Sequence, residues 1–116
     1  MRITRFNIKL LTWIVVISLS SMGFSQDFSA TMTASGGGSG GYGMTFGFHP
    51  SATDGYDDAY DQYAPSAPPP PAFDAALTWD GDRYYTQILA GDGDLSEHVY
   101  DIALAYGSDN LITLTW

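Results

Sequence analysis

The sequence contains no cysteine, and its 116 residues include only four lysines and arginines against 13 aspartates and glutamates. The lack of cysteine excludes disulfides, cysteine nucleophiles and thiolate metal sites. Three of the four cations, Arg2, Arg5 and Lys9, lie near the N-terminus. Residues 26–116 therefore hold one cation, Arg83, against all 13 acids, which gives a formal charge of −12. A surface with this charge repels nucleic acid and anionic lipid, so we expect no nucleic acid partner.

The three N-terminal cations begin a segment that is typical of a secretory signal peptide. An apolar run follows over residues 10–19, and small residues then occur at Gly23 and Ser25, spaced as signal peptidase prefers. The run is shorter than the about 20 residues that a transmembrane helix needs. We therefore expect residues 1–25 to be a cleaved signal peptide. The remaining protein would be secreted or displayed at the cell surface, with no membrane span left after cleavage.

Short segments in which apolar and polar residues alternate recur along the rest of the chain, and alternation is the signature of a half-buried strand. The expected strands cover residues 28–34, 43–48, 73–79, 84–90, 98–106 and the segment from 112 to the end. Turn sequences such as Asp80-Gly81-Asp82 separate them. The pattern predicts an all-β fold, an antiparallel β-sandwich of the immunoglobulin or fibronectin kind. Its core is expected to include Trp79 and Trp116, which lie on apolar strand faces.

Composition divides the expected module into parts. Residues 26–43 would form an N-terminal strand and a flexible Gly/Ser-rich loop from 35 to 43, and residues 44–116 would form the sandwich. Within the sandwich, residues 49–72 read as an Asp/Tyr/Pro-rich surface connection, because the four consecutive prolines at 68–71 lack backbone donors. The chain ends on a large apolar strand residue, so we expect a fragment whose sandwich is incomplete at the C-terminus.

The densest acidic cluster holds four carboxylates within eight residues: Asp54, Asp57, Asp58 and Asp61. Calcium takes six to eight oxygen ligands, so these four aspartates are the candidate metal ligands and calcium is the one candidate cofactor. Their spacing does not match an EF-hand loop. The alternative is a solvated polar loop whose tyrosines pack along the sandwich.

The sequence offers no convincing catalytic group. His49 and His98 are the only histidines, and glycines surround Ser39 only within a low-complexity tract. We therefore expect no enzyme and no catalytic residues. Tyr84 and Tyr85 are more informative, because only one of two neighbours on a strand can face inward. The other ring would be free to stack on a sugar, so this pair is the candidate ligand-binding site.

Several segments between residues 44 and 116 resemble a module of large secreted bacterial proteins, many of them cargo of the type IX secretion system. The most specific are Ala52-Thr53-Asp54-Gly55-Tyr56-Asp57 and the proline run 68–71, accompanied by Thr45-Phe46-Gly47, the strand 83–88 and the closing Leu114-Thr115-Trp116. The resemblance implies a β-sandwich near the N-terminus of a longer protein, followed by further domains. It implies no catalytic residues.

These observations favour a non-catalytic structural or adhesive module of a secreted or cell-surface bacterial protein. Its partners would be a glycan or neighbouring domains of the same protein. One alternative is a carbohydrate-binding module of a secreted glycan-degrading protein. Another is an assembly subunit whose open sheet edge accepts a strand from a neighbour.

Overall fold

A computed structural model describes residues 27–36, 38, 40–91, 97–107 and 111–116. These residues form seven strands and no helix, which confirms the predicted all-β fold: β1 (Phe28–Gly36), β2 (Gly41–His49), β3 (Gln62–Tyr63), β4 (Asp74–Trp79), β5 (Asp82–Ala90), β6 (Asp101–Ala105) and β7 (Ile112–Thr115). The predicted signal peptide, residues 1–25, lies outside the described residues. Within the part of the chain that the structure describes, no helix could cross a membrane.

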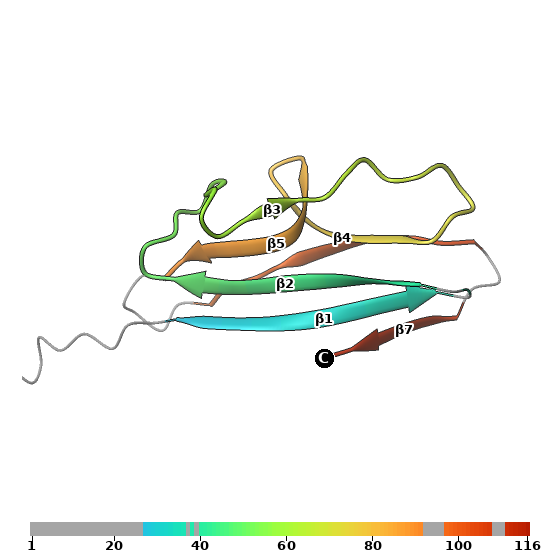
Figure 1. Cartoon of the computed structure of the whole chain (residues 1–116), viewed down its shortest axis with the longest axis horizontal. Coiled ribbons are helices and arrows are strands. Elements are labelled where there is room, and N and C mark those ends of the chain that lie inside the picture. Colours follow the sequence, from blue (N-terminus) through green and yellow to red (C-terminus); the bar gives the residue numbers. More distant parts are fainter. Residues whose placement is uncertain (1–26, 37, 39, 92–96, 108–110) are drawn as a thin grey trace, which may run out of the picture.

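The strands form one mixed sheet in the order β6-β4-β5-β2-β1-β7, and the short strand β3 pairs with β5 (Figure 1). The expectation of a wholly antiparallel fold is wrong at one position, because β2 and β5 run parallel from Thr45 opposite Thr86 to His49 opposite Ala90. A parallel pair needs a long crossover, and residues 50–81, which contain β3 and β4, provide it. The mixed sheet curls into a half-barrel.

Strands β1 and β2 form a long antiparallel hairpin that aligns their predicted apolar faces. Phe28 lies opposite Phe48, and Met32 lies opposite Met44, so both apolar faces lie on the same side of the sheet. The loop expected over residues 35–43 is shorter, because Ser35 pairs with Gly41 and both strands extend into the glycine tract. The described part of residues 26–43 thus belongs to the same sheet as the rest.

The core lies between the β1–β2 hairpin and the β4–β6 pair. Its buried cluster draws residues from four strands: Ala34, Met44, Ala75, Leu77 and Tyr84. Aromatic residues bridge the two layers, with the ring of Tyr42 against Phe73 and the ring of Tyr100 against Phe46. The Tyr100 hydroxyl donates to the Gly47 carbonyl oxygen, which fixes the segment before β6 on the inner face of β2. This contact between layers holds the curvature of the sheet.

The predicted turn between β4 and β5 is confirmed, whereas the predicted burial of the tryptophans is wrong. Asp80 and Gly81 have φ angles of 48° and 85°, the left-handed pair of a tight type I′ hairpin turn. Trp79 is 40% exposed and Trp116 is 86% exposed. Alternation assigned both to an inner face, but Trp79 ends β4 next to the turn and Trp116 follows β7, beyond the layers that could cover them.

Candidate binding surface

Three tyrosines form a stack on the side of the sheet where β3 pairs with β5. The rings of Tyr56 and Tyr63 are parallel within 4°, with centroids 4.1 Å apart, and the Tyr63 ring contacts Tyr84 at 5.1 Å. We call Tyr56, Tyr63 and Tyr84 the tyrosine stack. Tyr84 is buried beneath, while Tyr56 and Tyr63 are 39% and 48% exposed. Offset packing of this kind favours a fixed ring geometry, so the stack presents a preformed aromatic surface.

The acidic loop, residues 53–61, holds Tyr56 in place through its own carboxylates. Asp57 accepts hydrogen bonds from the backbone N–H of Thr53 at 2.7 Å and from the Thr53 hydroxyl at 3.1 Å. The Thr53 hydroxyl oxygen in turn accepts from the N–H of Gly55 at 3.2 Å. Short polar side chains commonly fold turns by such bonds to nearby backbone groups. The loop is therefore ordered locally by hydrogen bonds among its own residues.

Asp61 connects the acidic loop to β5. It is 8% exposed, and its two carboxylate oxygens accept from the backbone N–H groups of Asp57 at 2.8 Å and Ile88 at 2.7 Å. The next residues, Gln62 and Tyr63, form β3 and continue along β5, with Gln62 opposite Thr86. The carboxylate thus extends the β3–β5 ladder by one side-chain bond. Charge-assisted bonds of this kind are among the stronger hydrogen bonds in proteins.

A hollow of about 320 Å³ lies next to the tyrosine stack. We call it the arginine hollow, and its lining residues are Tyr63, Ala64, Ser66, Gly81, Asp82 and Arg83. The guanidinium of Arg83 is held in place, because Nη2 pairs with the buried Asp74 at 2.6 Å and Nε donates to the Pro65 carbonyl oxygen at 3.1 Å. The hollow therefore combines an aromatic ring, a carboxylate, a hydroxyl and an oriented guanidinium.

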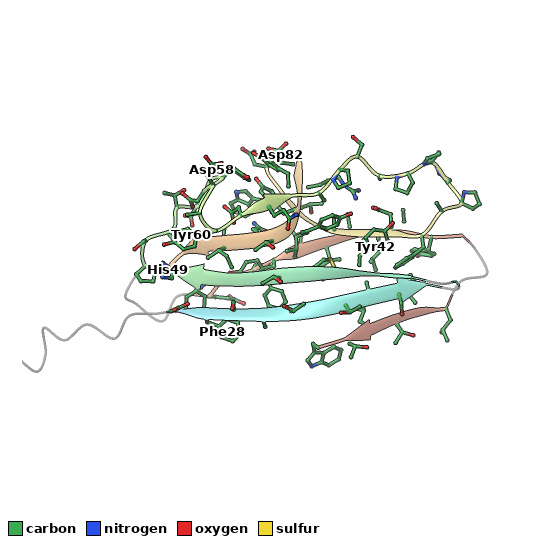
Figure 2. All side chains as sticks on the ribbon, viewed as in Figure 1. Phe28, Tyr42, His49, Asp58, Tyr60 and Asp82 are labelled. Carbon is green, nitrogen blue, oxygen red and sulfur yellow. The ribbon has the colours of Figure 1, made fainter. Side chains whose placement is uncertain are left out.

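Carboxylates surround the tyrosines and affect their titration. Burial is the largest cause that raises the pKa of Tyr84 to about 12, and the nearby Tyr63 and Asp82 also raise it. Desolvation, and then the Asp58 carboxylate, raise the pKa of Tyr56 above its usual value. Asp58 and Asp82 both lie on the β3 side of the sheet (Figure 2). At neutral pH the phenols are therefore uncharged, and the charge on this surface comes from its carboxylates and Arg83.

The two residues of the predicted ligand-binding pair differ in burial, and their binding of a ligand stays a prediction. Tyr84 is 4% exposed and supports the other two rings of the stack, and Tyr85 is half-buried with its ring stacked on Tyr42. The exposed rings of the tyrosine stack are those of Tyr56 and Tyr63, which the sequence analysis placed in the surface connection 49–72.

The four predicted calcium ligands do not converge. Asp57 and Asp61 bind backbone N–H groups within the loop, and Asp54 accepts from the N–H of Ala90 at 3.2 Å. Asp58 is exposed. Among the described residues, no group of three or more acidic or histidine side chains could hold a metal ion. Calcium binding at these aspartates thus stays a prediction without support from the geometry.

The two histidines occupy separate structural positions. His49 accepts from the Ser51 N–H through Nδ1 at 3.0 Å, and its ring stacks on Tyr60. The His98 ring stacks on Phe48, and its Nε2 lies 2.9 Å from the Ala90 carbonyl oxygen. A second hollow of about 290 Å³ lies beside His98, lined also by Trp79, Asp54 and Glu97. Each ring is thus used for packing and for ordering a strand end.

No protein family model, curated protein or solved structure matches the chain. The site must therefore be interpreted from its own geometry. Sequence reasoning missed the pairing of Tyr56 with Tyr63. The sequence does contain three tyrosines close together, at 56, 60 and 63, but the register between that segment and β5 depends on the Asp61 bond, which no alternation pattern reveals.

Proposed function

We propose that the chain is a non-catalytic structural or adhesive module of a secreted or cell-surface bacterial protein, and that the tyrosine stack is its adhesive surface. One observation carries the proposal: the carboxylates of the acidic loop are bonded to backbone N–H groups, and the result of that bonding is an exposed, preformed aromatic pair. Exposed aromatic groups that are held rigidly on a polar surface are typical of recognition sites.

Several further features support a role in display rather than in chemistry. A catalytic group needs an activating partner within hydrogen-bond reach, whereas the side chains of His49, Asp54 and Asp61 accept hydrogen bonds from backbone N–H groups. The strong negative charge suits a soluble exported surface. We further propose that the chain is the N-terminal module of a type IX secretion cargo protein. We also propose that its fold is a β-sandwich of the immunoglobulin or fibronectin kind. The facing layers around Met44 and Leu77 are compatible with such a module.

Two experiments test this proposal. The first expresses the full chain with a C-terminal tag in a bacterial host and determines the N-terminus of the exported product by mass spectrometry. We expect cleavage after Ser25 or Gln26. The second measures retention of the fluorescently labelled chain on two kinds of surface, insoluble polysaccharide particles and protein-coated particles.

An adhesive module is retained on at least one surface and is released when Tyr56 and Tyr63 are both changed to alanine. The matched control is Tyr106→Ala, which removes another exposed tyrosine that lies outside the stack. Cytoplasmic retention of an uncleaved chain would contradict the assignment to export. Failure to bind any surface, or equal binding by the double variant, would contradict the adhesive role.

A further inference from the structure

We propose that the arginine hollow, together with the exposed edge of the tyrosine stack, binds a neutral saccharide. This inference rests on the adhesive role proposed above and names the class of ligand for the same surface. The proposed sugar site differs from the one predicted from the sequence, because the sugar would pack against Tyr63 rather than against Tyr84 or Tyr85.

The aromatic part of the site is Tyr63, which belongs both to the stack and to the hollow. Tyr56 packs against its ring at 4.1 Å, and Tyr84 supports it from below at 5.1 Å, so the ring cannot turn freely. The apolar C–H face of a sugar ring packs well on an aromatic surface of this kind. Because the ring is already fixed, little side-chain entropy is lost on binding.

The polar part of the site supplies both donors and acceptors. The Asp82 carboxylate accepts, the Ser66 hydroxyl can do either, and Arg83 donates. The Arg83 Nε and Nη2 atoms are bonded to Pro65 and Asp74, and no acceptor among the described residues bonds its Nη1. The guanidinium is therefore oriented by the protein and retains donors for a ligand. Sugar hydroxyls, which both donate and accept, match such a mixed set.

The distribution of charge argues for a neutral ligand. An anion in the hollow would meet the carboxylate of Asp82, which is one of the lining residues. A cation would face Arg83, which lines the same hollow. A neutral molecule with several hydroxyl groups can form hydrogen bonds with both the Asp82 carboxylate and the Arg83 guanidinium, and it is repelled by neither. The hollow, of about 320 Å³, is at the lower end of the range for ligand pockets, which suits a short saccharide.

The test begins with the purified full chain on an array of neutral and charged glycans, followed by calorimetric titration with the neutral disaccharides cellobiose, maltose and diacetylchitobiose. We expect at least one neutral glycan to bind. Tyr63→Ala should weaken its affinity at least tenfold, Ser66→Ala about threefold, and Tyr63→Phe less than threefold, because the phenylalanine retains the ring. Tyr106→Ala, the exposed control outside the site, should leave the affinity unchanged. Circular dichroism checks that every variant keeps the parent fold.

Three results would overturn the inference. They are the absence of binding to every neutral glycan, stronger binding of the cationic chitobiose or the anionic digalacturonate than of their neutral counterparts, and affinity that does not depend on Tyr63. The particle experiment separates this failure from failure of the adhesive role. A chain that binds protein-coated particles but no saccharide contradicts only the ligand class, whereas a chain retained on no surface contradicts the adhesive role itself.

Discussion

The β1–β2 hairpin and the acidic loop reach ordered structures by different means. The hairpin has a continuous ladder from Phe28 opposite Phe48 to Ser35 opposite Gly41, and its residues Ala34 and Met44 are buried in the core cluster. The acidic loop has no ladder and little buried apolar surface. It is ordered by carboxylates that bind backbone N–H groups, chiefly Asp57 and Asp61. The stability of the hairpin should therefore depend on the volume of its side chains. The stability of the loop should depend on single hydrogen-bonding atoms.

The largest effect is expected from Gly47→Ala in the hairpin. A Cβ at Gly47 would overlap the carbonyl of Phe28 and the Cα of Ser29, both of them backbone atoms of the neighbouring strand. Since β1 cannot yield without breaking the ladder, we expect the free energy of unfolding to fall by about 3 kcal/mol. Urea denaturation followed by circular dichroism measures the change.

Gly43→Ala is the matched control in the same strand. A Cβ at Gly43 would meet no atom within 4 Å, and the residue has an ordinary strand φ angle. The free energy of unfolding should then change by less than about 0.5 kcal/mol. If the two alanine variants were equally stable, the close approach of β1 to β2 at Gly47 would be incorrect.

The second effect, somewhat smaller, is expected from Asp61→Ala in the acidic loop. The substitution leaves the N–H groups of Asp57 and Ile88 without their charged acceptor, so we expect a loss of about 2 kcal/mol in the free energy of unfolding. The near-ultraviolet circular dichroism of the tyrosine stack should weaken at the same time. Asp58→Ala removes an exposed carboxylate of the same loop and should change neither quantity appreciably. Equal behaviour of the two variants would show that Asp61 does not hold the loop.

The contrast between the hairpin and the acidic loop also explains which parts of the structure could be predicted from the sequence. Alternation identified the segments that form β1, β2, β4, β5, β6 and β7, and the sequence Asp80-Gly81-Asp82 marked the β4–β5 turn, because both signals depend on neighbouring residues. Alternation does not predict which residues are buried in the central strands β4 and β5. Four consecutive residues of β4, 74–77, are buried, and Gln87, Ile88 and Leu89 are buried together in β5, since these strands are covered on both faces.

The candidate site was harder to predict, because it depends on contacts between distant residues. The carboxylates of residues 54–61 were correctly identified as a dense cluster, but carboxylate density cannot distinguish a metal ligand from an acceptor for backbone N–H groups. The parallel register of β2 with β5 and the bond from Ile88 to Asp61 together determine which tyrosines become neighbours. Neither this register nor this hydrogen bond can be predicted from a repeating pattern of residues in the sequence.

The smallest expected effect is the dependence of the free energy of unfolding on pH. One buried tyrosine from each region allows the two regions to be compared. Burial raises the pKa of Tyr84, in the tyrosine stack, and of Tyr100, against the hairpin, each to about 12. In the unfolded chain tyrosine titrates near 10, so the unfolded state loses its protons first. The stabilisation from these phenols is therefore complete below about pH 10 and is lost as the pH rises toward about 12.

We expect the free energy of unfolding to fall by about 1–2 kcal/mol between about pH 9 and pH 11, measured by urea denaturation at each pH. Tyr84→Phe should reduce this decrease, because phenylalanine does not titrate. Asp82→Asn sharpens the comparison further. Asp82 contributes to the raised pKa of Tyr84, whereas the carboxylate that raises the pKa of Tyr100 is Asp54. Titration of tyrosinate absorbance should therefore show a lower pKa for Tyr84 in Asp82→Asn and no change for Tyr100, and equal shifts at both tyrosines would mean that the two regions share one electrostatic environment.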